Sequence, residues 1–277
     1  MIATTDLPQT PVSVVGPERD YISYSAITTY QQCPLRYRFK YIDGLSESVV
    51  SSSLVFGGAI HSALEFHFTE LLCGNEPPSQ DLLLDVFQDA WETRATDYED
   101  IRFGKGEDHN SLSSLADRML TAFRSTPTSQ SHDTVIGIEE ELRGELIPGV
   151  PDLLARIDLL TTTSDALVIT DFKTARSRWS QNQAENSASQ LLLYSELARR
   201  MMPDRDVRLR FLVLTKTKTP TVEAFDIDVS RQRAQRTVKV VEHTWRAVEA
   251  GHFYPAPGPM NCPSCPFRRA CNAWNGN

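Results

Sequence analysis

The sequence predicts an α/β or α+β fold built as one large domain. Apolar residues recur at helical spacing before Pro127, and after it they gather in short β-branched runs typical of strands. One helical stretch interrupts these runs and another follows them. The 277 residues are 40% hydrophobic and 23% charged, as in an ordinary globular protein, so disorder throughout the chain is excluded.

The first half is expected to be helical. Residues 1–20 lack periodicity and predict a flexible tail ahead of a single domain over 21–277. Ser25 is expected to cap a short helix, and Pro34 to occupy the first turn of the next. The serine-rich residues 46–53 predict a loop. Further helices are expected from Gly57 onward, over 80–98 and over 112–123.

The second half is expected to supply the sheet. Strands are expected over 135–142, 155–160, 167–172, 207–214 and 222–229. Helices are expected over 184–201 and from a cap at Ser230 to about residue 250. Residues 255–277 form a cysteine-containing tail with little secondary structure of its own.

The net charge of −8 conceals an uneven distribution of charges along the chain. Residues 199–277 carry 14 Lys and Arg against 7 Asp and Glu, which predicts a local phosphate-binding face or, alternatively, a solvated helix surface. The candidates for phosphate contacts include Arg208, Arg210, Lys216, Lys218, Arg231 and Arg233. Residues 65–108 hold 12 acidic and 3 basic residues, and they predict a solvated helical insertion over 65–127 that is structural rather than catalytic.

The sequence gives no sign of a membrane span or of an export signal. No window approaches the roughly 18 consecutive apolar residues that a span needs. The N-terminus lacks a basic region followed by an apolar one, so a cytoplasmic location is expected. The five cysteines are then expected to be reduced thiols or metal ligands rather than disulfides.

The most informative chemistry lies at the ends of two neighbouring predicted strands. Asp158 lies within the apolar run Ala-Arg-Ile-Asp-Leu-Leu, and the next strand ends with Asp171 and Lys173. Alternation places Asp171 and Lys173 on one face and Phe172 on the other. Adjacent strands can therefore present both carboxylates to one Mg²⁺ or Mn²⁺ ion, with the lysine beside them. The alternative is three separate charges that face solvent.

The order of these motifs resembles a known family. Asp158, followed after twelve residues by Asp171-Phe172-Lys173, resembles the catalytic core of the PD-(D/E)XK nuclease superfamily. Further features resemble its RecB-type branch, which includes AddB-like and CRISPR-associated exonucleases: His61 in Phe-Gly-Gly-Ala-Ile-His, Gln190 and Tyr194 in a Q-x-x-x-Y motif, and Cys33 before a proline. The literal Pro151-Asp152 pair lies upstream of the strand and is not taken as the motif.

The resemblance implies a restriction-endonuclease-like core, in which a central mixed sheet is flanked by helices, and a role for each matching residue. His61, Asp158 and Asp171 would bind the divalent metal, with the Phe172 carbonyl as a further ligand. Lys173 would assist the attacking water. Gln190 and Tyr194 share one helix face at i, i+4 and would position DNA or Lys173. Glu65, four residues after His61, is a weaker candidate on the same face as the histidine.

The cysteines predict a second metal site. Cys262, Cys265 and Cys271 crowd the C-terminal tail, and either Cys33 or Cys73 supplies a fourth thiol. Four thiolates suit a tetrahedral Zn²⁺ or a [4Fe–4S] cluster, so ligand chemistry leaves the metal open. The resemblance implies Cys33 as the fourth ligand and an iron–sulfur cluster, which leaves Cys73 as a free thiol.

These features together predict a Mg²⁺- or Mn²⁺-dependent deoxyribonuclease, most simply an exonuclease of DNA repair or recombination. Two alternatives remain: a CRISPR-associated nuclease that trims DNA before spacer integration, and a cluster-containing DNA-binding subunit with little cleavage activity. The chain has no Gly-x4-Gly-Lys-Ser/Thr loop, so any unwinding must come from a helicase partner. The expected partners are therefore DNA, including single-stranded DNA, and a helicase or a CRISPR integrase.

Overall fold

The structure, a computed structural model, describes residues 20–130, 134–259 and 261–276. The predicted tail over 1–20 therefore lies almost wholly outside the described residues. The helices are α1 (Tyr24–Gln32), α2 (Pro34–Tyr37), α3 (Ser52–Leu72), α4 (Gln80–Ala95), α5 (His109–Arg124), α6 (Gln181–Ser187), α7 (Ser189–Met201), α8 (Arg231–Glu249) and α9 (Arg268–Ala273). A π-helical turn over Arg38–Ile42 follows α2, and a 3-10 turn over Pro127–Gln130 follows α5.

A mixed sheet forms the centre of the molecule, so the predicted fold class is confirmed. Its strands are β1 (Tyr21–Ser23), β4 (Thr134–Gly144), β5 (Asp152–Thr162), β6 (Ala166–Ala175), β7 (Asp206–Thr215) and β8 (Val222–Ile227). The order is β1-β5-β6-β7-β8, with β4 paired to β5. β1 and β5 run parallel, as do β6 and β7, and the remaining pairs are antiparallel. A separate two-stranded ribbon joins β2 (Val49–Ser51) to β3 (Asp100–Arg102).

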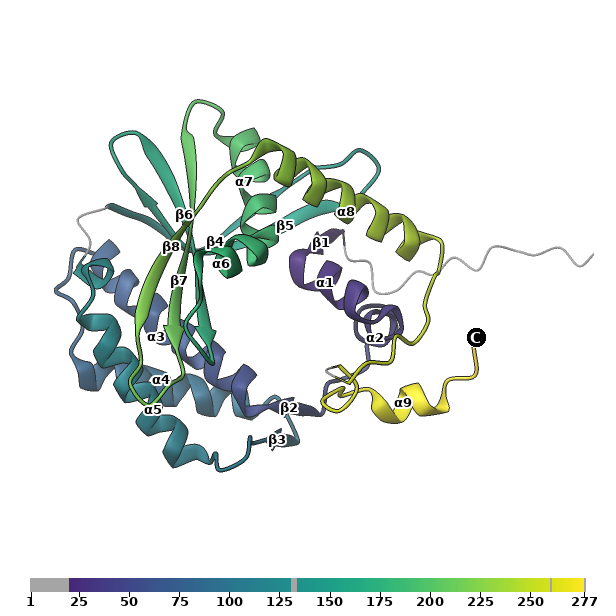
Figure 1. The fold of residues 1–277 in the computed structure, drawn as a ribbon, viewed down its shortest axis with the longest axis horizontal. Coiled ribbons are helices and arrows are strands. Elements are labelled where there is room, and N and C mark those ends of the chain that lie inside the picture. Colours follow the sequence, from purple (N-terminus) through teal and green to yellow (C-terminus); the bar gives the residue numbers. More distant parts are fainter. Residues whose placement is uncertain (1–19, 131–133, 260, 277) are drawn as a thin grey trace, which may run out of the picture.

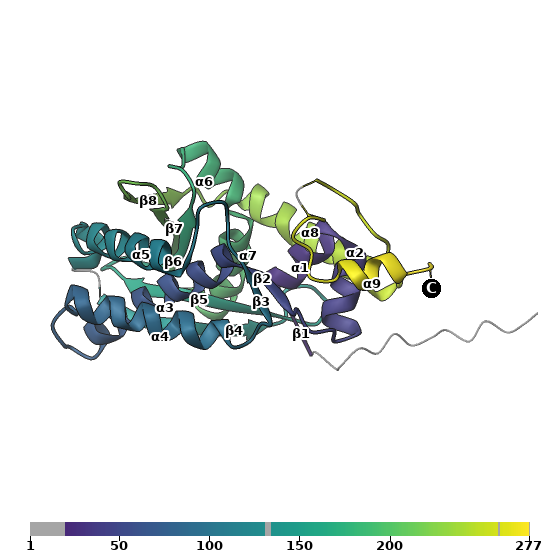
Figure 2. The ribbon, with the colours of Figure 1, turned by 90° about the horizontal axis from the view of Figure 1, so that it is seen from below.

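Helices cover both faces of the sheet, and each interface has its own apolar core (Figures 1 and 2). The first core packs α1, α7 and α8 on one face, where Leu191, Leu193 and Phe211 are fully buried. The second packs α3, α4 and α5 on the other face, where Phe56 and Phe172 are fully buried. The predicted acidic insertion thus supplies most of one helical layer.

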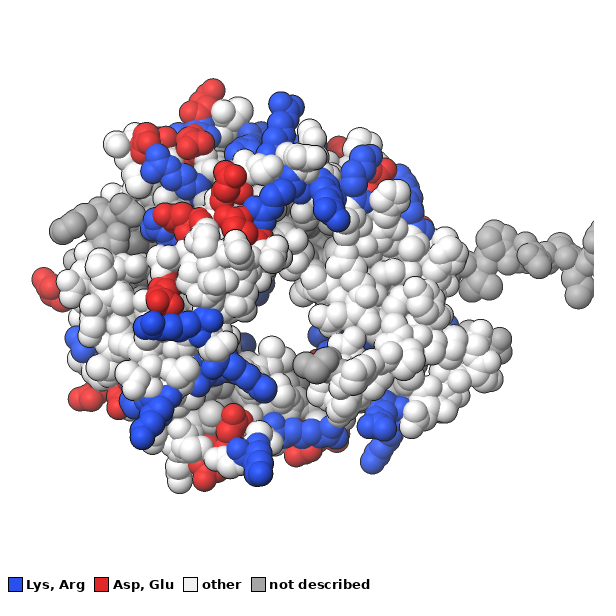
Figure 3. All heavy atoms as spheres, viewed as in Figure 1, with Lys and Arg blue, Asp and Glu red and all other residues white. Residues whose placement is uncertain are grey.

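The chain closes around a central opening. Figure 3 shows this opening in the space-filling surface, at the place that Figure 1 shows between the sheet with α6, the α1–α2 pair and the β2–β3 ribbon. The ribbon reaches the C-terminal tail, where the Arg102 guanidinium donates a hydrogen bond to the Pro263 carbonyl at 3.3 Å. The N-terminal helices, the insertion and the tail therefore all border one hole.

Several predicted boundaries are wrong in detail. Ser23, rather than Ser25, caps α1 by accepting a hydrogen bond from the Ala26 amide. The predicted loop over 46–53 contains β2 and the first residues of α3, so Gly57 lies inside a helix rather than at its start. The helix expected over 184–201 is two helices, which meet at Ala188.

None of the helices described is long and apolar enough to cross a membrane.

Candidate active site

The candidate site lies at a gap in the pairing of the central sheet. On one edge of β5, pairing with β1 ends at Leu154 and pairing with β6 begins only at Leu159. Asp158 lies at the end of this gap, next to the first paired residue. The alternation of the strand also changes phase there, because Ile157 belongs to the core under α7 and Leu159 to the core under α3. A polar side chain can therefore turn into the gap without leaving the strand.

Asp158 turns toward β6 and toward α3. Its Oδ2 atom accepts a hydrogen bond from the Phe172 amide at 2.6 Å, so a side chain takes the place of a backbone partner as the two strands separate. The same oxygen lies 3.5 Å from Nδ1 of His61, whose ring meets the Phe172 ring edge-on with centroids 5.7 Å apart. The long helix α3 thus delivers the predicted histidine to the predicted aspartate.

A polar chain leads from Asp171 to α7. Nζ of Lys173 lies 2.6 Å from Oδ2 of Asp171 and donates a hydrogen bond to Oε1 of Gln190 at 3.4 Å. The Gln190 amide in turn donates to the Tyr194 hydroxyl at 3.2 Å. That hydroxyl also accepts from the backbone of Arg156, inside the gap in the sheet. The predicted residues of this set therefore lie together, on the face of β6 opposite Phe172.

Burial makes the site costly to charge. It is the main cause that raises the pKa of Asp158 and of Asp171 to about 6, although the Lys173 ammonium opposes the rise in both. Burial also lowers the pKa of His61, which favours the neutral imidazole that a metal requires. Burial raises the pKa of Tyr194 to about 12, so its hydroxyl keeps its proton.

Two glutamates extend the acidic centre. Burial, with the neighbouring Glu139 charge as the next cause, raises the pKa of Glu65 to about 8, and the two carboxyls share a hydrogen bond. Glu139 lies on β4 in register with Asp158, and its φ of 51° places it in the left-handed region that non-glycine residues seldom adopt. Sequence reasoning missed Glu139, because alternation alone does not foretell a strained residue in a long strand.

The site lies between two hollows. The larger, of about 540 Å³, is lined by His61, Glu65, Glu139 and Lys173, and also by Arg94 from α4. The guanidinium of Arg94 lies over Gly58, where a methyl group would come within 2.8 Å of it, and it donates to the Ser62 hydroxyl at 3.3 Å.

The second hollow, of about 460 Å³, lies on the other side, against α1 and α7. Its lining includes Asp158, Gln190 and Tyr194 together with Tyr24 and Lys40 of the N-terminal helices. Asp158 therefore faces the second hollow, while His61 and Lys173 face the first.

The candidate ligands have the chemistry that a divalent cation prefers, but their side chains are not arranged around a common point. Two carboxylates, a neutral imidazole and the Phe172 carbonyl are ligands that Mg²⁺ or Mn²⁺ accepts. Within the described ranges, however, no three His, Cys, Asp or Glu side chains are arranged to hold a metal ion. Asp171 is engaged with Lys173, and Asp158 with Phe172, so a cation has to displace these contacts.

The four predicted cysteine ligands belong to a small cluster beside the opening. Cys33, Cys265 and Cys271 pack against a satellite core centred on Leu35, Phe39 and Phe267. Burial raises the pKa of the Cys271 thiol, and the three other sulfurs add to the rise, which places all four near one another. Cys73 lies apart and exposed at the end of α3. The described thiols are not arranged to bind a metal, so the metal site at these cysteines stays a prediction.

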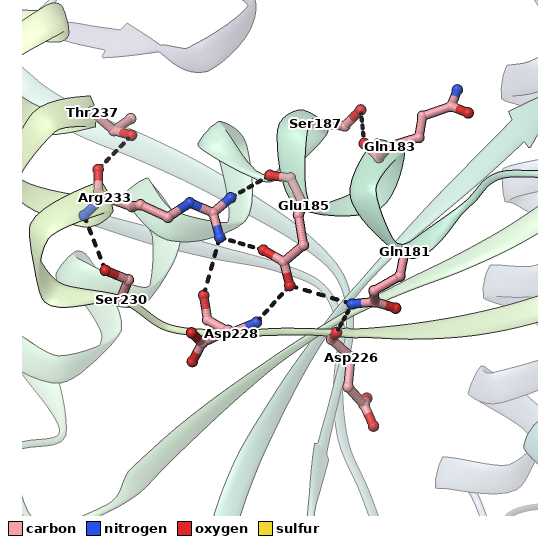
Figure 4. A network of polar contacts seen from close by, with 9 residues as sticks. All are labelled: Gln181, Gln183, Glu185, Ser187, Asp226, Asp228, Ser230, Arg233 and Thr237. Atoms are coloured by element: carbon pink, nitrogen blue, oxygen red, sulfur yellow. Dashed lines mark hydrogen bonds and ion pairs between the residues drawn. The ribbon is translucent and has the colours of Figure 1, made fainter.

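Carboxylates of the chain itself already neutralise much of the C-terminal positive charge. Arg208 pairs with Asp165 and Arg210 with Asp226. In Figure 4, Arg233 of α8 lies against Glu185 of α6, contacting both its carboxylate and its backbone carbonyl. These three arginines are therefore less available to phosphates than their clustering in the sequence predicts.

Comparison with known proteins identifies the family. The model of the PD-(D/E)XK nuclease superfamily matches residues 21–272. The chain belongs to the PD-(D/E)XK nuclease superfamily. Asp152 of the literal Pro151-Asp152 pair begins β5 and pairs with Arg143 at 3.1 Å. Membership makes the chain a nuclease by family.

One solved structure shares the fold, and a second shows a weaker likeness. A protein from Eubacterium rectale, described as a "putative exonuclease", is 14% identical, with a TM-score of 0.50 over 91% of this chain and 88% of that one. The structure of SSO0001 is also 14% identical, with a TM-score of 0.37 over 90% of this chain and 95% of the other. No curated protein matches the chain.

Proposed function

We propose that the chain is a metal-dependent DNA exonuclease that hydrolyses phosphodiester bonds. One observation carries the proposal: Asp158 and Asp171 meet across a gap in the sheet, with Lys173 beside them, between two hollows. Both carboxylates are almost fully buried, and burial alone makes two such charges unfavourable. A cation that accepts both of them would account for their position.

The proposed metal ligands are His61, Asp158, Asp171 and the Phe172 carbonyl. A bound Mg²⁺ or Mn²⁺ would supply a water of lowered pKa and would offset charge on the phosphate. Lys173, released from Asp171 but still held by Gln190, would orient the attacking water. Tyr194 holds Gln190 in place and keeps its own proton, so its part is positioning.

The central opening favours an exonuclease over an endonuclease. The larger hollow is lined by residues of α3, α4 and the insertion, and the smaller one by residues of the N-terminal helices and α7. A strand that enters a closed ring must enter by an end. A single strand is thinner than a duplex and can thread a narrower ring, so we propose single-stranded DNA as the substrate.

The four cysteines Cys33, Cys262, Cys265 and Cys271 are proposed to bind a [4Fe–4S] cluster, with Zn²⁺ as the alternative. Such a cluster would tie the N-terminal helices to the tail and so hold the ring closed. Its role would be structural, because hydrolysis requires no electron transfer. A ring of this kind suits DNA repair or recombination, in which a helicase delivers the strand that is degraded.

The decisive test compares purified variants on radiolabelled single-stranded DNA with Mg²⁺ or Mn²⁺. Asp171→Ala should abolish cleavage, and Lys173→Ala should reduce it by about 10²- to 10⁴-fold, as loss of a group that assists proton transfer does. Asp165→Ala, at an exposed hairpin of the same sheet, is the matched control and should cleave normally. Full activity in Asp171→Ala would disprove the site, and equal digestion of circular and linear strands would disprove exonuclease action.

A further inference from the structure

A third hollow, of about 380 Å³, opens beside the larger one and collects cations from three distant segments. Lys105 comes from the loop before α5, Arg176 follows the end of β6, and Lys216 follows the end of β7. Ser53, in the first turn of α3, lines both this hollow and the one at the candidate active site. The two hollows are therefore neighbours along one surface.

These three cations outnumber the acidic side chains that line the hollow with them. Within the described residues, none of Lys105, Arg176 and Lys216 forms an ion pair, whereas Arg143, Arg156, Arg208, Arg210, Arg233 and Arg246 all do. The single acidic side chain in the lining, Glu107, accepts hydrogen bonds from the Ser52 hydroxyl and the Gly104 amide, both at 2.9 Å. The hollow thus keeps a charge of about +2 in a chain whose net charge is −8.

The surroundings of Lys216 disfavour its positive charge. Its Nζ is half-buried, donates to the Ser53 hydroxyl at 3.3 Å and lies 5.8 Å from the centre of the Phe56 ring. Burial and then the Arg176 charge lower its pKa. An anion between these side chains would relieve their repulsion and supply the missing partner.

The position of this hollow relative to the candidate active site indicates which anion it binds. Arg176 lies three residues beyond Lys173 on the same strand end, a span of about 10 Å in extended chain. We propose that this hollow, defined by Lys105, Arg176 and Lys216, binds a phosphate group of the strand whose neighbouring phosphodiester lies at Asp158 and Asp171. The proposal rests on the nuclease function proposed above and adds to it a subsite that holds the strand in register.

Binding and cleavage are measured separately, so that the two proposals can fail independently. The probe is a fluorescent 12-nucleotide single-stranded DNA in Ca²⁺, prepared with a 5′-phosphate, with a 3′-phosphate or with neither, and compared with a circular strand. Lys105→Gln and Arg176→Gln are the test variants. Arg178→Gln and Arg118→Gln are the matched controls, because each removes the same charge outside the hollow: Arg178 lies beside Glu223 at 3.9 Å, and Arg118 donates to its own helix at the Ser114 carbonyl.

Each test variant should weaken binding about tenfold and reduce the slope of log affinity against log salt by about 1, while the controls change neither. A loss confined to one phosphorylated end identifies a terminal phosphate, and an equal loss on all three linear strands identifies a backbone phosphate; either outcome supports the subsite. Unchanged binding in Arg176→Gln, or an equal loss in Arg178→Gln, overturns it. A wild-type protein that binds but never cleaves would refute the nuclease proposal and leave this binding result standing.

Discussion

Replacing Asp171 with Asn should stabilise the metal-free protein while it abolishes cleavage. The Asp171 side chain is only 6% exposed, and burial raises its pKa from an ordinary value of 3.8 to about 6. At pH 8 the ionised carboxylate therefore costs about 3 kcal/mol of folding free energy, since each tenfold change in acidity corresponds to 1.36 kcal/mol. This cost is already net of the attraction of Lys173, which opposes the rise in pKa, so Asn removes it, and the imperfect fit of an amide in place of the carboxyl group offsets part of the gain. We expect a net gain of about 1–3 kcal/mol.

The pH dependence of the stability difference between the wild type and Asp171→Asn follows from the direction of the pKa shift. A group whose folded pKa lies above its unfolded pKa favours folding at low pH, and this contribution is lost as the pH rises from about 4 to 6. Urea denaturation in EDTA should therefore show a large advantage for Asp171→Asn at pH 8 and about half of it at pH 5. With Mg²⁺ present the order should reverse, because only the wild type gains stability from the metal.

Asp165→Asn is the control for this experiment. Asp165 is fully exposed, and hydrogen bonding by Thr163 lowers its pKa, so its replacement should bring no gain at pH 8. If Asp171→Asn destabilises the metal-free protein at pH 8, then the carboxylate is a structural partner of Lys173. The argument that burial prepares this site for a cation would then be refuted.

Three further predictions follow from the surroundings of the site. Gly58→Ala should raise the free energy of unfolding by about 0.5–1 kcal/mol, because Ala favours a helix interior. It should nevertheless reduce cleavage, because the added methyl group displaces the Arg94 guanidinium from its place over α3, and Arg94→Gln should reduce cleavage likewise. The double variant should lose no more activity than either single variant, which a double-mutant cycle on initial cleavage rates will show. Tyr194→Phe should cost about 1 kcal/mol of stability in urea denaturation and lower kcat more than it raises KM, because Gln190 loses its anchor and the gap in the sheet loses a hydrogen bond. Cys33→Ser should bleach an anaerobically purified brown protein and lower its Tm, whereas Cys73→Ser should do neither; a colourless protein that contains one zinc would exclude iron.

The sequence is enough to predict which candidate residues come together, but not the gap in the sheet that receives them. Strand alternation and the spacing from Asp158 to Asp171 predict that the two carboxylates oppose each other, and the structure places them so. The gap that receives Asp158 was not predictable, because it exists only where the short β1 strand stops pairing with β5. Glu139 was missed for a similar reason, since its importance depends on a strained backbone and on the register of β4.

The glycines before His61 show how packing can overrule a local signal. Gly57 and Gly58 indicate a helix start, because glycine disfavours helix interiors. The helix instead begins at Ser52 and carries both glycines where neighbours approach closely. A methyl group on Gly57 would lie 3.3 Å from the Thr174 hydroxyl, and one on Gly58 would meet Arg94. Glycine thus lets α3 lie close to β6 and lets Arg94 lie over α3, whereas a methyl group at either position would press on its neighbour.

The acidic insertion has a larger part in the site than its composition predicts. Residues 65–108 contain only three cations against twelve acidic residues, and all three lie at the opening or in its hollows. Arg94 lines the hollow at the carboxylates, Lys105 lines the neighbouring basic hollow, and Arg102 binds the C-terminal tail across the ring. The abundant acidic side chains that face outward would repel a polyanion from the rest of the layer. If the proposed nuclease function holds, an insertion with this arrangement would direct a nucleic-acid strand inward, to the few positions where its phosphates meet positive charge.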